Sequence, residues 1–108
     1  MGDPPKAKPS IASTIRIRVG TTRPVTDGLV EKISFKELSF QCGVQYPEGT
    51  HLYAELESGI FPKLPIKGRI LDVEQAPPER DRFGGGHIHR MLVLVKGDEY
   101  FRFVELLT

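Results

Sequence analysis

The sequence predicts an all-β fold, a small antiparallel barrel of six or seven strands. Three observations predict it: apolar and polar residues alternate in several short segments, Gly and Pro residues separate those segments, and no stretch has the spacing of an amphipathic helix. A closed barrel is favoured over an open sandwich because closure removes exposed strand edges. A chain of 108 residues has room for one such domain.

The N-terminal segment is expected to precede this fold. Residues 1–10 contain three of the nine prolines and almost no apolar side chains, so they cannot contribute to a core. We therefore expect a disordered tail over residues 1–12 and a barrel domain over residues 13–108.

Period-two alternation indicates the individual strands. Ile15 and Ile17 alternate with Arg16 and Arg18, as in a strand with one buried face. Similar patterns recur along the chain, and the expected strands cover residues 13–19, 29–33, 38–42, 52–57, 66–73, 91–95 and 100–106. The residues expected mainly inside are Ile15, Ile17, Leu38, Phe40, Leu52, Leu56, Ile66, Ile70, Val93 and Phe103.

The connections between the strands follow from composition. Ser34 is expected in a polar bend between the second and third strands, and Gln75 to Gly86 form the longest irregular stretch. Gly97-Asp98 is the signal of a tight hairpin. The segment from Tyr100 to Leu106 is therefore expected to pair back as the closing strand.

Short motifs along these strands occur in a recognisable order. They are Gly28, Ile33-Ser34, Gly49, the strand from Leu52 to Glu57, Ile66-Lys-Gly-Arg-Ile70 and Phe101-Arg-Phe103. Together, from Ile15 to Leu107, they resemble the PilZ domain family. PilZ domains are six-stranded antiparallel barrels of bacteria, and many bind cyclic di-GMP. The resemblance implies that they do so through an Arg-x-x-x-Arg segment before the barrel and an Asp/Asn-x-Ser-x-x-Gly turn between two early strands.

The chain departs from both parts of this ligand motif. The turn reads Lys32-Ile33-Ser34-Phe35-Lys36-Glu37, in which only Ser34 matches, and no two arginines have the spacing of the first motif. Lysine lacks the planar fork with which arginine binds phosphate. We therefore expect a non-enzymatic PilZ-like regulatory module of the motility, pilus or biofilm type, which acts through a protein partner and binds cyclic di-GMP weakly or not at all.

A direct receptor for cyclic di-GMP or another anionic nucleotide is the alternative. Its candidate ligand-binding residues are Arg16, Arg18, Lys32, Ser34 and Lys36. Arg16 and Arg18 share a strand face, so their two guanidinium groups have the geometry to bracket a phosphate. The simpler interpretation is that both are solvated residues on the outer face of a strand.

Two further residues are candidate contacts for a protein partner. Arg23 precedes Pro24 in an expected loop, and Phe83 precedes three consecutive glycines. We expect Phe83 at the apolar tip of a mobile hairpin loop. The loop lacks the Lys-Ser/Thr ending of a nucleotide-binding loop, which disfavours a phosphate-loop function.

No metal or other cofactor is predicted. His87 and His89 lie on the same side of an extended segment, a geometry usable for zinc, but only His51 and Cys42 remain as further soft ligands. Solvent-facing strand histidines are the expected alternative. Nor does a catalytic set stand out, because Ser34 has no His nearby in sequence and Cys42 occupies a buried strand position. An enzyme is therefore not expected.

The composition restricts partners and location. Fifteen Lys plus Arg against fourteen Asp plus Glu give a net charge of +1, and there is no Trp, which disfavours a barrel that binds single-stranded nucleic acid. A single cysteine is compatible with a reducing compartment. No apolar run has the length of a membrane span or a secretion signal. We expect a soluble cytoplasmic protein that does not contact a membrane.

Overall fold

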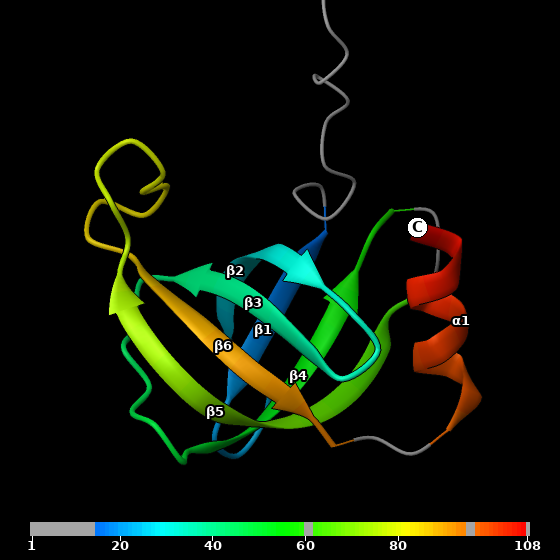
Figure 1. The fold of residues 1–108 in the computed structure, drawn as a ribbon. Coiled ribbons are helices and arrows are strands. Elements are labelled where there is room, and N and C mark those ends of the chain that lie inside the picture. Colours follow the sequence, from blue (N-terminus) through cyan, green and yellow to red (C-terminus); the bar gives the residue numbers. More distant parts are fainter. Residues whose placement is uncertain (1–14, 60–61, 95–96, 108) are drawn as a thin grey trace, which may run out of the picture.

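The computed structural model of the chain describes residues 15–59, 62–94 and 97–107. Within these residues, six antiparallel strands form a closed barrel, and one α-helix follows the last strand (Figure 1). The prediction of a small all-β barrel is confirmed, whereas the expected tail, residues 1–12, lies outside the described residues. The elements are β1 (Arg16–Gly20), β2 (Thr26–Ile33), β3 (Glu37–Cys42), β4 (His51–Glu57), β5 (Leu64–Gln75), β6 (His87–Val93) and α1 (Asp98–Leu107).

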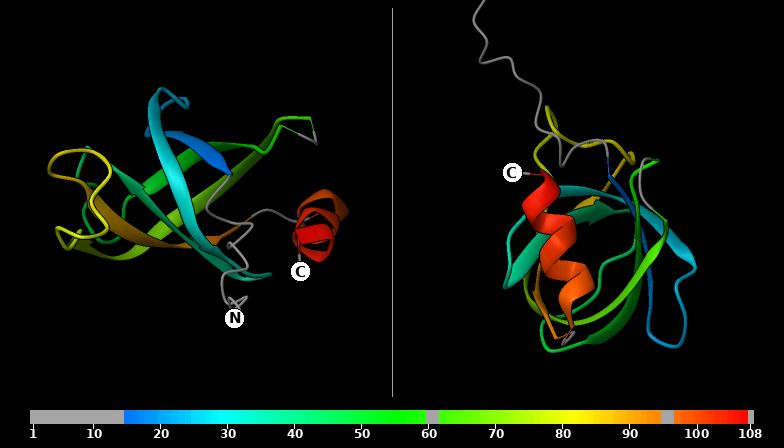
Figure 2. Two further views of the ribbon diagram at one scale, coloured as in Figure 1. Left: turned by 90° about the horizontal axis from the view of Figure 1, so that it is seen from above. Right: turned by 90° about the vertical axis from the view of Figure 1, so that its right-hand side faces the viewer.

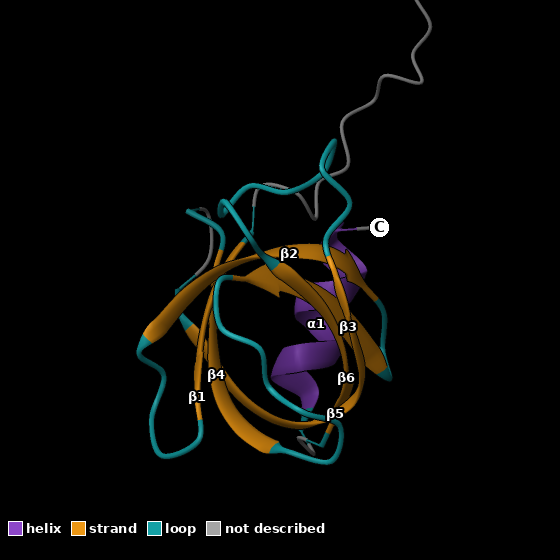
Figure 3. Ribbon diagram, turned by 90° about the vertical axis from the view of Figure 1, so that its left-hand side faces the viewer, coloured by secondary structure: helices purple, strands orange, loops and turns teal. Residues whose placement is uncertain are grey.

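The barrel closes because β1 pairs with both β2 and β4. The strand order is β1-β2-β3-β6-β5-β4, and each neighbouring pair is antiparallel. Figure 3 shows the strands wrapped into a ring, with α1 beyond its far end. Arg16 lies opposite Leu29 of β2 and Glu57 of β4. Since neighbouring residues of a strand point to opposite faces, Arg16 and Arg18 lie on the outside while Ile17 points inward.

The interior is built from the apolar face of each strand. Nine of the ten residues expected inside are buried, and Val93 is partly buried against the same core. The alternation of apolar and polar residues therefore identified the core correctly. Phe103 is the one of these residues that reaches the core from α1 and not from a strand.

The C-terminal segment is a helix, so the prediction of a closing strand over residues 100–106 is wrong. Tyr100, Phe103 and Val104 are buried, whereas Phe101 is half exposed. Spacings of three and four residues are those of a helix face, and Asp98 and Glu99 in the first turn favour a helix N-terminus. The pairing of β1 with β4 already closes the barrel, which leaves no free edge for a seventh strand.

α1 lies across one end of the barrel (Figure 2). The Tyr100 hydroxyl donates a hydrogen bond of 2.6 Å to the carbonyl oxygen of Ser34, in the turn between β2 and β3. The rings of Phe35 and Phe101 lie beside this bond, with their centroids 5.3 Å apart. The helix is thereby joined to the turn that carries several of the predicted site residues.

Candidate functional site

The five candidate ligand-binding residues belong to two different surface pockets. Arg16 and Arg18 line one of about 430 Å³ on the outer face of β1. Lys32, Ser34 and Lys36 line another of about 730 Å³ around the β2–β3 turn. The structure therefore does not gather all five residues into the single site that the sequence suggested.

The Ser34 side chain is used within the β2–β3 turn itself. Its Oγ donates to the carbonyl oxygen of Glu37 at 2.9 Å and accepts the Glu37 backbone N–H at 3.2 Å. The Ser34 backbone N–H also donates to Glu37, at 2.9 Å. Lys32 and Lys36 flank Ser34 in sequence, and both are exposed. The turn thus presents two ammonium groups, while its hydroxyl is already hydrogen bonded.

Glu37 belongs to an ion-pair network across three strands. Arg90 of β6 contacts Glu37 of β3 at 3.1 Å and Asp72 of β5 at 2.7 Å. The hydrogen bonds that Arg90 donates to Asp72, and then to Glu37, raise the pKa of Arg90 above its ordinary value. Glu37 takes the position at which the PilZ resemblance implies a glycine, and here it stabilises pairing between strands. Such exposed pairs contribute little individually, and the network increases their effect modestly.

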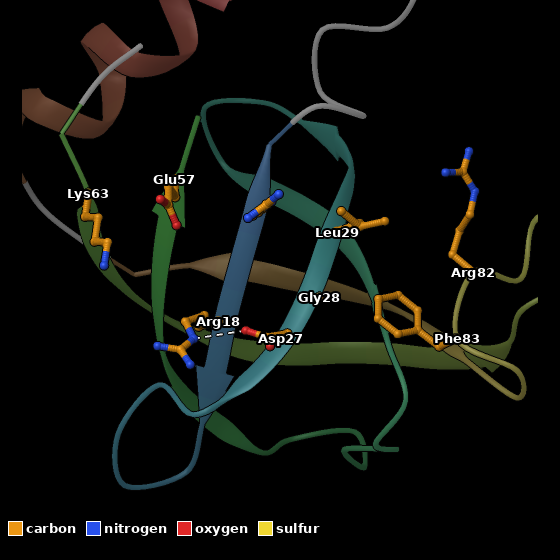
Figure 4. A pocket seen from close by; sticks show the side chains of 9 residues that line it. Arg18, Asp27, Gly28, Leu29, Glu57, Lys63, Arg82 and Phe83 are labelled. Carbon is orange, nitrogen blue, oxygen red and sulfur yellow. Dashed lines mark hydrogen bonds and ion pairs between the residues drawn. The ribbon is translucent and has the colours of Figure 1, made fainter. Parts of the chain in front are cut away.

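The outer face of β1 carries the more charged of the two pockets, which we call the β1 pocket (Figure 4). Its lining residues are Arg16, Arg18, Asp27, Gly28, Leu29, Glu57, Lys63, Arg82 and Phe83. Four of them are cationic and two are carboxylates. Arg18 is paired with Asp27 at 3.0 Å, which neutralises one cation. The remaining charged groups give the β1 pocket an excess of positive charge.

Gln41 positions one wall of the β1 pocket by anchoring the loop between β5 and β6. Its side chain is fully buried on the outer side of β3, under that loop. Nε2 donates to Glu31 and to the Arg80 carbonyl oxygen, each at 3.0 Å, and Oε1 accepts the Arg82 backbone N–H at 2.7 Å. The Arg80 guanidinium is also ion paired with Glu31. These contacts hold the loop against β2 and β3 and place Arg82 at the β1 pocket.

Asp81 fixes the glycine-rich part of the same loop. Its carboxylate accepts backbone N–H groups from Phe83 at 2.9 Å, Gly86 at 3.0 Å and Gly85 at 2.6 Å. These donors, the Phe83 amide first among them, hold the pKa of Asp81 below its usual range. Gly84 and Gly85 have positive φ angles of 65° and 123°. Residues with a side chain rarely adopt such backbone angles.

This arrangement differs from the expectation of Phe83 at an exposed loop tip. The loop is held by Gln41 and Asp81, and Phe83 is only partly exposed at the wall of the β1 pocket. Its amides already bind a carboxylate of the chain, so the loop does not work as a phosphate loop. Arg23 lies exposed in the loop between β1 and β2, as expected.

The histidine pair lies on one side of β6, as predicted, but His89 does not face solvent. His89 is fully buried and stacks on Phe40, with ring centroids 4.7 Å apart. Its Nε2 accepts the Tyr46 backbone N–H at 3.0 Å, and burial lowers its pKa to about 4. The expectation of a solvent-facing side chain is wrong for His89, because β6 begins at His87, before the expected start at Met91. Extending the alternation backward from Met91 identifies His89 as an inward residue.

The other potential soft ligands do not join His89. His51 is exposed at the start of β4, and Cys42 is buried on β3. The Cys42 Sγ donates to the Val44 carbonyl oxygen at 3.2 Å, and burial raises the pKa of the thiol. Across the residues that the structure describes, no three His, Cys, Asp or Glu side chains are grouped closely enough to hold a metal ion.

The remaining sequence predictions concern family and location. In the described part of the chain, no helix has the length and hydropathy needed to cross a membrane. Comparison with family models, with curated proteins and with solved structures finds no match to this chain. The resemblance to PilZ domains therefore stays a prediction that rests on the residues quoted above.

Proposed function

We propose that this chain is a non-enzymatic PilZ-like regulatory module of bacterial cyclic di-GMP-related signalling, of the motility, pilus or biofilm type, and that it acts by binding a partner protein. One observation carries the proposal: two exposed aromatic rings lie together where the β2–β3 turn meets α1. With the lysines beside them, Phe35, Phe101, Lys32 and Lys36 form what we call the turn-helix patch. The closed barrel supports the PilZ-like part of the proposal.

The aromatic rings of the patch are exposed although they are large and apolar. Phe35 is 47% exposed and Phe101 is 48% exposed, and their rings contact each other at a tilt of 58°. Adjacent exposed aromatic side chains are typical anchors of protein interfaces. The Tyr100 hydrogen bond and the buried face of α1 hold the two rings in place. A preordered surface loses little conformational entropy when a partner docks.

The charges around the patch indicate the chemistry of its partner. Lys32 and Lys36 are exposed and have no carboxylate partner among the described residues. On the helix side, Asp98 and Glu105 lie about one turn before and after Phe101. The patch therefore has a basic side and an acidic side. We infer a partner segment that inserts an apolar side chain between the rings and directs carboxylates toward the two lysines.

We expect cyclic di-GMP to bind weakly because, in this chain, the positions of the family's ligand motif are already bonded within the fold or lack the required arginines. The Ser34 hydroxyl is hydrogen bonded within the turn, and Glu37 is paired with Arg90. Arg16 and Arg18, which were to substitute for the missing arginine pair, belong to another pocket. A ligand at the turn would meet two lysines and Arg90, whose guanidinium group is already paired with Glu37 and Asp72. This geometry supports a module that recognises protein rather than cyclic di-GMP.

The candidate nucleophiles and bases are also poorly placed for catalysis. Ser34 is bonded to backbone atoms of Glu37, and the Cys42 thiol is buried with a raised pKa. His89 is buried, with its Nε2 occupied by a backbone donor. In the described residues these side chains make no nucleophile-base pair with one another, which supports the non-enzymatic part of the proposal.

A peptide-display selection on the immobilised protein tests this proposal. Peptides with an apolar anchor flanked by Asp or Glu should be enriched, and the tightest should lose at least about tenfold in affinity when Phe35→Ser and Phe101→Ser are combined, as for an interface hot spot. Val44→Ser, which changes an exposed apolar residue in the β3–β4 loop, is the matched control and should leave affinity unchanged.

A charge reversal separates the apolar contribution from the charged one. Lys32→Glu with Lys36→Glu should weaken acidic peptides but spare peptides in which the carboxylates are replaced by amides. Selected peptides that bind the aromatic double variant as tightly as the parent would show that the patch is not the docking surface. Low-micromolar cyclic di-GMP binding would contradict the proposed preference for protein.

A further inference from the structure

The β1 pocket contains cations that have no ion-pair partner within the part of the chain that the structure describes. Arg18, Arg80 and Arg90 are each ion paired with at least one carboxylate. Arg16, Lys63 and Arg82 line the β1 pocket, and their side chains have no ion-pair partner among the described residues. The contrast between the two groups is informative, because the chain supplies carboxylate partners for Arg18, Arg80 and Arg90 but not for the other three cations among the described residues.

We propose that the β1 pocket binds a nucleoside polyphosphate, with the phosphates on Arg16 and Arg82 and the base against Phe83. This site is separate from the turn-helix patch and does not depend on the proposed protein partner. Guanidinium groups suit phosphate because they present paired N–H donors in a planar fork. The volume of about 430 Å³ lies within the range of small-molecule sites.

The two arginines come from different elements that are each fixed. Arg16 lies on β1, between its ladders with β2 and β4. Arg82 lies on the β5–β6 loop, where its backbone N–H is bonded to Gln41. Figure 4 shows Lys63 and Arg82 on opposite sides of the pocket, with the β1 strand between them. Cations on both sides suit a ligand with more than one anionic group.

The loop amides restrict how the ligand is held. Asp81 already accepts the N–H groups of Phe83, Gly85 and Gly86. The phosphates must therefore be bound by side chains and not by a nest of backbone amides. This distinguishes the β1 pocket from a phosphate loop and makes single side-chain substitutions informative.

The pocket also has an apolar wall and an acidic position. Phe83 is partly exposed, and Leu29 lies across from Arg16 on β2, so an organic group finds a nonpolar contact beside the cations. Asp27 is paired with Arg18. Glu57, directly opposite Arg16 on β4, has no ion-pair partner among the described residues and repels a phosphate placed near it. Removing its charge should therefore increase affinity.

Titration of the full chain with GTP at low salt, followed by amide NMR shifts and by calorimetry, tests the proposal. Shifts should concentrate on β1 and on residues 82–83. Arg16→Ala and Arg82→Ala should each weaken binding about three- to tenfold, an amount reduced by solvent screening of exposed charges. Glu57→Gln should tighten it. Arg23→Ala removes the same charge from an exposed loop outside the pocket and should change affinity much less.

Pyrophosphate separates the phosphate contact from the base contact. Phe83→Leu should weaken GTP but leave pyrophosphate unchanged, and unchanged pyrophosphate binding also shows that the pocket remains folded. No GTP binding at millimolar concentration overturns the site. An equal loss in Arg23→Ala and Arg16→Ala also overturns it, since it reports only net charge. Equal effects of Phe83→Leu on GTP and pyrophosphate overturn the assignment of a nucleotide.

Discussion

The Tyr100 hydroxyl donates to the Ser34 carbonyl oxygen at 2.6 Å and so joins α1 to the β2–β3 turn. Tyr100→Phe removes the donor and leaves this carbonyl without that bond. We expect the free energy of unfolding to fall by about 1 kcal/mol, the usual net value of one hydrogen bond. Urea unfolding measures the change. Tyr53→Phe, at an exposed tyrosine of β4, is the control, and an equal loss there would contradict the assigned role.

Buried His89 should make stability depend on pH. Its pKa is about 4 in the folded protein against an ordinary value of 6.5, so the unfolded chain binds the proton first as pH falls. The stability associated with neutral His89 is fully present above pH 6.5 and is lost progressively between pH 6.5 and 4. The loss should total up to about 3 kcal/mol, because one pKa unit corresponds to about 1.4 kcal/mol.

Two variants isolate this pH effect. His89→Gln keeps a polar side chain at the position and should flatten the unfolding free energy between pH 6.5 and 4, whatever its effect at neutral pH. His51→Gln, at an exposed histidine, should leave the profile unchanged. Carboxylates titrate in all three proteins, so differences between the profiles report the histidines. A parallel profile for His89→Gln would show that His89 is not the group responsible.

Gln41 should control the order of the β5–β6 loop. Gln41→Leu removes two donated hydrogen bonds and one accepted bond that tie Glu31, Arg80 and Arg82 together. We expect faster hydrogen exchange of the Arg82 amide and a loss of about 1–3 kcal/mol in unfolding free energy, because buried polar groups lose their partner. Gln45→Leu, at an exposed position, is the control. Unchanged exchange at Arg82 would show that other contacts hold the loop.

Cyclic di-GMP should bind with a dissociation constant of about 100 μM or weaker, since each missing charge-assisted contact removes roughly 1.5–3 kcal/mol. Lys32→Asp with Glu37→Gly rebuilds the family's turn, yet we expect no micromolar binding. Arginine contacts to phosphate are still missing, and Arg90 loses one of its two carboxylate partners. Calorimetry at one salt concentration compares the two proteins. Micromolar binding by the rebuilt turn would show that the turn alone suffices.

The strands were predictable because period-two alternation is a local signal. Ile15, Ile17 and Phe40 occupy the interior that their spacing indicated. The C-terminal segment was wrongly predicted as a strand because it is rich in aromatic residues, which favour strands. Its buried positions nevertheless have the spacing of a helix, as Tyr100 and Phe103 show. The local pattern alone does not decide between a strand and a helix for this segment. Closure of the barrel by β1 and β4 decides it, and that pairing joins residues far apart in sequence.

The candidate site was predictable only in part. Arg16 was recognised from its strand position, but Lys63 and Arg82 reach the same pocket through folding that brings distant loops together. Gln41 gave no signal either, because its importance comes from a loop that begins more than thirty residues later. Phe101 entered the turn-helix patch only once its segment proved helical.

The carboxylate of Asp81 does inside the β5–β6 loop what a bound anion does in a phosphate loop. Asp81 therefore fixes the backbone conformation of the loop, and the loop does not need a bound ligand to adopt it. The side chains at positions 82 and 83 can therefore be substituted without changing the backbone conformation of the loop. This makes the loop a natural place to redesign ligand preference, provided that Asp81 and the two glycines with positive φ are kept.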